Sequence, residues 1–228
     1  MEAIILPEVI IARFLEAAIA TIRKDIEMCL SGEEKNTILY QLLGENVDGQ
    51  PIKINNYNYF NQAVKIFSNP ANLNVFIGYN AQVTTALAVH IILPGEQASE
   101  CPLGEGQEWD EAAGQFSYSQ WLEAQYQIII TSDNSNEAMI AYNVIKSMIL
   151  MYAPNLDLMG LKIPRISGGD IVIQQDIIPV NVFHKAITLG FKYELCVPSR
   201  LRSQIVKQIN YNYNIYDSVT GEYTLKTK

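Results

Sequence analysis

WLEAQYQIIIT (Trp121–Thr131) is the stretch of sequence that decides the fold. Apolar or aromatic side chains occupy every second position, namely Leu122, Ala124, Tyr126, Ile128 and Ile130. A period of two residues is typical of a strand with one buried face. We therefore expect a strand here, and it is the first of four elements expected between Trp121 and Val197: a strand, a helix and two further strands.

A helix is expected after this strand. Asn134, with Glu137 three residues later, is typical of a helix N-terminus. Apolar residues then recur at helical spacing as far as Pro154, where proline should end the helix, and they are Ala138, Ala141, Val144, Ile145, Met148 and Tyr152. SGGD (Ser167–Asp170) predicts a tight turn before a strand at 171–175. Alternation in Phe183–Val197 predicts a long central strand.

The N-terminal half supplies further elements. Pro7–Leu30 predicts an amphipathic helix with an apolar stripe, and shorter elements follow it: a helix at Glu33–Leu43, a short strand at Ile52–Ile54 and a helix at Phe60–Phe67. Two alternating segments, Leu73–Tyr79 and Val83–Leu93, predict strands. The segment between them, GYNAQ, is short enough for a hairpin, which would make the two strands antiparallel. Pro94-Gly95 is expected to end the second strand. The expected fold class is α/β (α+β), a mainly antiparallel sheet flanked by helices.

Composition excludes several classes of protein. Of the 228 residues, 49% are hydrophobic and 18% are charged, which is typical of a folded globular chain. No apolar run approaches the ~20 residues of a membrane span. The N-terminal residues do not resemble a signal peptide, so we expect cytoplasmic synthesis. Three scattered cysteines indicate neither a disulfide framework nor a metal knuckle.

Charge is unevenly distributed along the chain. The net charge is −8, residues 66–160 contain ten acidic residues and one basic residue, and residues 161–228 contain five acidic and nine basic residues. Opposite charges on different parts of the chain favour head-to-tail contacts between copies. Residues 95–114 form an acidic insertion, expected to be a protruding loop. Its candidate residues for a DNA-repelling lumen or a partner surface are Glu105, Glu108, Asp110 and Glu111.

Residues 199–228 are expected to form an arm beyond a main domain of residues 1–198. IYDSVTGEYTLK alternates around Thr220-Gly221 and predicts a small hairpin, which would be stable mainly on a sheet edge such as that of a neighbouring copy. The arm contributes the candidate subunit-interface residues Arg200, Arg202, Lys207, Tyr211, Tyr213 and Tyr223.

Catalytic chemistry has little support in the sequence. His90 and His184 each lie in a predicted strand outside any metal-ligand spacing, so sheet-face positions are favoured over catalysis. GEG at 104–106 lacks the rest of a dinucleotide fingerprint. The acidic insertion could collect a divalent cation, but its spacing is not that of a calcium loop, and a solvated loop is the simpler interpretation. We expect no cofactor and no enzyme activity.

Three segments carry a resemblance to a known family. They are YQIIITSDNSNEAMIAYNVIKSMIL (Tyr126–Leu150), RISGGDIVIQQDIIP (Arg165–Pro179) and FHKAITLGFKYELCVPSR (Phe183–Arg200). With the long N-terminal helix, they resemble the tail-terminator and neck proteins of tailed bacteriophages.

The resemblance implies a non-enzymatic virion protein in a homo-oligomeric ring, commonly hexameric, at the junction of tail and head. Its partners would be the connector (portal) side and the tail tube, with DNA passing through the lumen and no membrane involved. Another neck or collar ring, or a head-completion protein, is the nearest alternative. A metal-dependent hydrolase using the acidic insertion and a cellular ligand-binding module are the alternatives from other classes.

Overall fold

The computed structural model describes residues 6–30, 34–46, 48–54, 57–78, 87–99, 107–110, 115–170, 182–197, 213–216 and 223–226. The chain divides into two compact units. One consists of 6–99 and 122–193 and contains the helices and most of the sheet; we call it the α/β unit. The other consists of 1–5, 100–121 and 194–228.

Helix α1 (Pro7–Leu30) is the longest helix in the described part of the chain and was predicted with these bounds. Proline in the first turn loses no helical hydrogen bond, and Glu8 there complements the positive end of the helix dipole. The predicted apolar stripe is buried throughout, at Ile11, Leu15, Ala18, Ile22 and Ile26. Burial of this stripe packs α1 against the sheet and α3.

The predicted helix at Glu33–Leu43 is in fact broken into a 3-10 turn, η1 (Glu34–Asn36), and helix α2 (Ile38–Leu43). Thr37 separates them, because its hydroxyl accepts a hydrogen bond from the backbone N–H of Tyr40 and caps α2. Asp25 of α1 accepts a second bond, from the backbone N–H of Ile38, at 2.6 Å. These bonds explain why a carboxylate and a hydroxyl are buried there.

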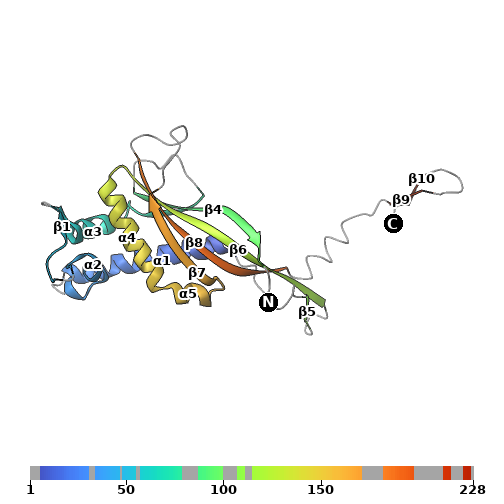
Figure 1. Cartoon of the computed structure of the whole chain (residues 1–228), viewed down its shortest axis with the longest axis horizontal. Coiled ribbons are helices and arrows are strands. Elements are labelled where there is room, and N and C mark those ends of the chain that lie inside the picture. Colours follow the sequence, from blue (N-terminus) through green and yellow to red (C-terminus); the bar gives the residue numbers. More distant parts are fainter. Residues whose placement is uncertain are drawn as a thin grey trace. The chain divides into compact units, whose positions relative to one another are not determined.

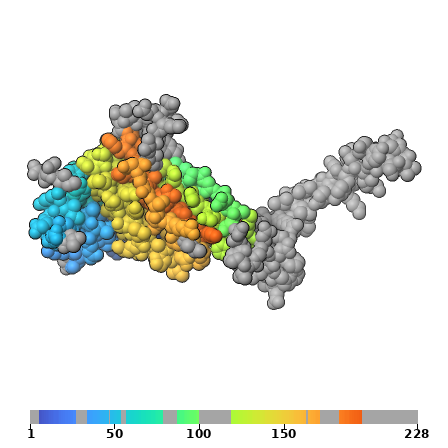
Figure 2. Space-filling view, viewed as in Figure 1, coloured from blue at the N-terminus to red at the C-terminus, as the bar shows by residue number. Residues whose placement is uncertain are grey.

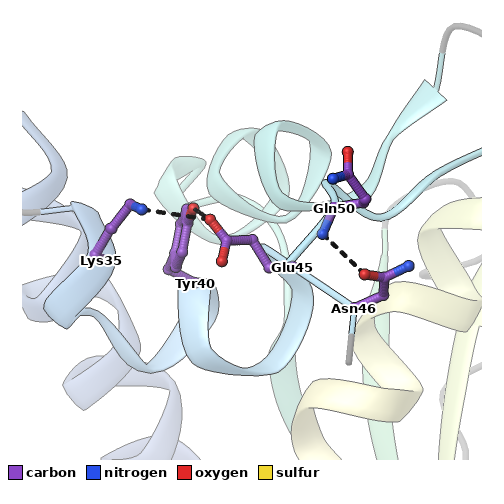
Figure 3. Close-up of polar contacts among 5 residues, drawn as sticks. All are labelled: Lys35, Tyr40, Glu45, Asn46 and Gln50. Atoms are coloured by element: carbon purple, nitrogen blue, oxygen red, sulfur yellow. Dashed lines mark hydrogen bonds and ion pairs between the residues drawn. The ribbon is translucent and has the colours of Figure 1, made fainter. Parts of the chain in front are cut away.

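A surface cluster of polar contacts follows α2 (Figure 3). The Tyr40 hydroxyl donates to Glu45, and Lys35 Nζ lies 3.5 Å from Glu45 Oε1. The hydrogen bond from the Tyr40 hydroxyl to Glu45 raises the pKa of Tyr40 and lowers the pKa of Glu45. The backbone N–H of Gln50 donates to Asn46 Oδ1 at 2.8 Å, which closes the turn leading to β1 (Lys53–Ile54) and β2 (Tyr57–Asn58). Helix α3 (Tyr59–Ser68), capped by Asn58, includes the predicted helix at Phe60–Phe67.

The main sheet has the strand order β3-β4-β6-β8-β7, and β5 also pairs with β6. Its strands are β3 (Asn74–Ile77), β4 (Ala88–Ala98), β5 (Gln107–Asp110), β6 (Gln115–Ser132), β7 (Lys162–Asp170) and β8 (Phe183–Val197). The pairs β4–β6, β5–β6 and β7–β8 are antiparallel. This architecture confirms the α+β fold class, and β8, with the predicted bounds, lies inside the sheet.

The predicted hairpin of β3 and β4 is wrong, because the two strands run parallel, with Asn74 opposite Ala88 and Ile77 opposite Ile91. Strand β4 begins at Ala88, and the predicted start of the second strand at Val83 lies outside the described residues. Ten residues, 78–87, therefore connect the strands. A parallel pair requires the connection to run back along the length of β3, which is about 13 Å for four residues at roughly 3.3 Å each. Ten residues are long enough for this.

The acidic insertion is only partly a loop. Strand β4 continues past Pro94-Gly95 to Ala98, contrary to prediction, and Gln107–Asp110 forms β5. Three steps along β4, from Ile92 to Gly95, match two steps along β6, so one extra residue bulges out beside Pro94. A proline is tolerated at a bulge because no ladder hydrogen bond is lost there. A similar shift flanks Pro164 in β7.

Ser167–Asp170 is not the predicted turn but the end of strand β7, paired with Lys185–Thr188 of β8. A Cβ atom at Gly168 would lie 2.6 Å from both the Ala186 carbonyl oxygen and the Tyr142 hydroxyl. Glycine is therefore required by the close approach of neighbouring atoms, and no turn is involved. The predicted strand at 171–175 lies outside the described residues.

Helix α4 (Ser135–Met151) begins where predicted, with Asn134 Oδ1 accepting the N–H of Asn136. Its predicted stripe is buried from Ala138 to Met148. Helix α4 ends at Met151, and a second helix, α5 (Ala153–Leu158), begins two residues later with Pro154 in its first turn. Figure 1 shows α4 and α5 alongside β7.

The predicted small hairpin is also present. Strands β9 (Tyr213–Tyr216) and β10 (Tyr223–Lys226) pair antiparallel, with Tyr223 opposite Tyr216 and Lys226 opposite Tyr213. They form a two-stranded sheet separate from the main one.

No helix among the described residues is both long and apolar enough to cross a membrane.

Candidate interaction surface

Strand β7 lies at one end of the main sheet, so one of its backbone edges has no paired strand among the described residues. The regular part of the strand, after the bulge at Pro164, is Arg165–Asp170. Every residue in it except the half-buried Ile166 is exposed. An exposed edge of six residues offers backbone N–H and C=O groups to another strand.

Four large apolar side chains are exposed at the C-terminal ends of α4 and α5, the two helices that precede β7 in the chain, and we call them the α4–α5 patch. Leu150 and Met151 end helix α4 and are 56% and 51% exposed. Leu158 and Met159 end helix α5 and are 83% and 45% exposed. Helix α5 contacts both α4 and β7, and Figure 2 shows the yellow α4–α5 region next to the orange strand on one face. Single exposed apolar residues are ordinary, whereas a group marks an interaction surface.

The α4–α5 patch carries no uncompensated charge. Between Ser147 and Leu161 the sequence has one charged residue, Asp157. Its carboxylate lies 3.5 Å from Lys162 Nζ, and Lys162 also donates to the Asp157 carbonyl at 2.8 Å. Covering this surface would therefore desolvate apolar atoms and one compensated ion pair, which favours burial against another protein.

Further along β7 the surface is basic and aromatic. The ammonium groups of Lys146 and Lys185 lie 5.4 and 5.6 Å from the centre of the Tyr142 ring. Lys185 also forms an ion pair with Asp170 at the end of β7. The two cations stabilise the position of the ring, which lies against Gly168.

The sheet also has a shallow hollow of about 250 Å³, lined by Gly95, Glu96, Gln97, Glu123 and Gln125. A smaller hollow beside it adds Arg165 and Lys192. Charged and amide residues make up most of both linings, so neither hollow has the predominantly apolar walls typical of small-molecule sites.

The two histidines are buried in strands, as predicted. His90 stacks on Phe76 at 5.5 Å, and its Nε2 lies 3.5 Å from the Thr131 hydroxyl. Among the described residues, neither ring nitrogen of His184 has a hydrogen-bond partner. Burial lowers the pKa of both rings, and the neighbouring His90 lowers the pKa of His184 further. Both are therefore neutral at pH 7.

Two tyrosine–carboxylate pairs connect the inner strands of the sheet to each other and to helix α1. Tyr126 of β6 donates to Glu8 of α1 at 3.0 Å, and Tyr193 of β8 donates to Glu96 of β4. Tyr126 stacks on Phe191 at 5.5 Å with the rings nearly parallel. Burial, followed by the carboxylate bond, raises the pKa of Tyr126 and Tyr193. These phenols stay protonated, so their role is to hold α1 and the strands together.

Most of the candidate residues from the sequence lie outside the described part of the chain. This holds for Arg200, Arg202, Lys207, Tyr211, Glu105 and Glu111. Tyr213 and Tyr223 lie in the β9–β10 hairpin, and Glu108 and Asp110 lie in β5, opposite Ser117 and Gln115. In the described residues, no three His, Cys, Asp or Glu side chains gather where they could hold a metal ion.

The α4–α5 patch was missed in the sequence. The signal that could have found it is the pair Leu158-Met159, which follows Pro154 and precedes Gly160. Two large apolar residues between a helix-initiating proline and a turn glycine indicate a short helix whose last turn carries apolar side chains that its own length cannot bury.

The chain matches no protein-family model and no curated protein.

Proposed function

We propose that the protein is a non-enzymatic structural subunit that assembles with copies of itself into a ring in the virion of a tailed bacteriophage. The observation that carries the assembly part is the α4–α5 patch together with the exposed edge of β7. An apolar patch and an unpaired strand edge together favour a permanent protein partner, because both are costly to leave in water.

The phage part of the proposal rests on the sequence resemblance of Tyr126–Leu150, Arg165–Pro179 and Phe183–Arg200 to tail-terminator and neck proteins. The ring occupies the junction between the head connector and the tail tube, and DNA passes through its lumen. The acidic residues of 95–114 repel the DNA backbone there, so the genome slides without sticking. The protein is a virion component and does not contact a membrane.

Obligate subunit contacts of this kind bury large surfaces with apolar centres. The α4–α5 patch supplies such a centre, and the polar residues of β7 supply a rim. Neither the two described hollows nor the buried His184 has the features typical of a substrate-binding site.

Light scattering after size exclusion, followed by negative-stain imaging, tests the proposal. We expect closed rings with an open centre, unchanged by a chelator. A chain that stays monomeric at every concentration and binds a divalent cation tightly would contradict both the ring and the absence of enzyme activity.

A further inference from the structure

The β9–β10 hairpin has only four paired positions on each strand, and no third strand of the described part of the chain pairs with it. A two-stranded sheet of this size is marginal in water, because it cannot bury enough apolar surface to offset its loss of conformational entropy. It needs a surface or a further strand to persist. Five of its eight residues are aromatic or large aliphatic: Tyr213, Ile215, Tyr216, Tyr223 and Leu225.

The edge of β7 has the room and the geometry that the hairpin needs. Arg165–Asp170 is six residues long, and each strand of the hairpin is four. The side chains of Gly168 and Gly169 are single hydrogens, so a second backbone meets no bulk from them. Adding two strands to an open edge pairs the exposed backbone groups of both partners.

The α4–α5 patch completes the match. A hairpin seated on β7 lies next to helices that contact the same strand. By the register of the two strands, Tyr216, Tyr223 and Leu225 share one face of the hairpin, and that face would have an apolar surface to cover. Lys226 shares the opposite face with Tyr213 and Ile215. Tyrosine is enriched in interfaces of this type because its ring is apolar and its hydroxyl remains hydrated.

We infer that the β9–β10 hairpin of one copy docks on the β7 edge and the α4–α5 patch of a second copy. Fifteen residues, 198–212, separate β8 from β9, a contour length of roughly 50 Å when extended, which is enough to reach a neighbouring molecule. The contact is head-to-tail, so each copy gives one hairpin and receives another, and the chain of contacts closes into a ring. This inference rests on the proposed self-assembly and adds which surfaces make it.

Two full-length variants isolate the two halves of the contact. Leu158→Lys places a charge in the α4–α5 patch at its most exposed residue, and Thr224→Pro removes a backbone donor from the hairpin. We expect each variant alone to be monomeric, with assembly weakened at least tenfold. Met151→Lys repeats the patch test at a second position. The matched control is Ile77→Lys on β3, which is 58% exposed and should leave assembly unchanged.

Mixing the two variants tests whether the contact is made between copies. The Leu158→Lys chain keeps an intact hairpin, and the Thr224→Pro chain keeps an intact patch. One contact can therefore form between them and no second one, so light scattering should report a species of twice the monomer mass and no ring. Superimposable far-ultraviolet circular-dichroism spectra of wild type, Leu158→Lys and Met151→Lys show that the fold is intact, whereas urea midpoints would also report the loss of assembly.

The outcomes separate this inference from the proposed function. If the wild type assembles and Leu158→Lys and Met151→Lys assemble equally well, the docking site is wrong while the ring stands. If the variants are monomeric and the mixture stays monomeric, the hairpin does not bridge two copies. A wild-type chain that is monomeric at all concentrations overturns both, and it then carries the hairpin on its own β7 or on another protein.

Discussion

The two ends of the main sheet differ in how they are protected. Strand β3 is four residues long, contacts α1, and is held by a cluster of hydrogen bonds at the segment before it. Strand β7 is nine residues long and largely exposed. Short edges covered by other elements resist pairing with other chains, whereas long exposed edges invite it. The difference indicates that β7 is the edge more open to pairing with another chain.

The largest effect is expected at the steric contact that fixes β7. Gly168→Val should destabilise the protein by about 3 kcal/mol, because its side chain would overlap the Ala186 carbonyl oxygen and the Tyr142 hydroxyl. Gly169→Val is the matched control, because it adds the same bulk to the β7 edge while nothing lies within 4 Å of its added Cβ, so the two variants differ only in the steric overlap within the fold. Urea unfolding of both variants measures the difference. Similar losses at the two glycines would mean that Gly168 is not the point where β7 meets α4.

A smaller effect is expected at the polar contact that fixes the β3 end. Arg23 of α1 donates from Nε to the Phe67 carbonyl at 3.2 Å and from Nη2 to the Asn72 carbonyl at 2.8 Å. Arg23→Met keeps the apolar stem and removes the donors, which should cost about 1.5 kcal/mol of unfolding free energy. The control is the exposed neighbour in Lys24→Met. If both substitutions leave the urea midpoint unchanged, the segment before β3 is held by packing alone.

The smallest effect concerns pH and the interior of the sheet between the two ends. Burial lowers the folded-state pKa of His184 below the ordinary histidine value of about 6.5. Stability is then complete above about pH 6.5 and falls as the pH decreases, because the unfolded chain binds a proton that the folded chain refuses. His184→Leu should flatten this dependence between pH 7.5 and 5.5. It should not destabilise the protein at neutral pH, since both ring nitrogens lack partners.

The histidine prediction has its own control. His90 stacks on Phe76 and lies near Thr131, so His90→Leu should lose stability at neutral pH even though it also removes a buried titrating ring. Equal behaviour of the two variants in urea unfolding at pH 7.5 would show that contacts do not distinguish the two rings.

Local features of the fold could be predicted from the sequence. Helices α1, α3 and α4 follow from apolar periodicity and from caps such as Asn134, and β8 follows from alternation, because all of these depend on residues close in the chain. The hairpin β9–β10 belongs to the same class.

Features set by distant contacts could not be predicted. The parallel pairing of β3 and β4 depends on strand order, the extension of β4 past Pro94 depends on a bulge against β6, and the strand at Gly168 depends on Tyr142. Exposure of the α4–α5 patch is likewise tertiary, since Leu158 would suit a buried helix face equally well. The interaction surface is therefore the part that sequence alone gave least access to.

The bond between Glu8 and Tyr126 joins residues 118 positions apart. At a translation rate of 5–20 residues per second, α1 leaves the ribosome roughly 6 to 24 s before its strand partner has been made. During that interval its apolar stripe, buried in the finished protein, is exposed on a nascent chain. Helix α1 is thus the segment where chaperone binding or premature aggregation would begin, and where codon usage would influence the yield of folded protein.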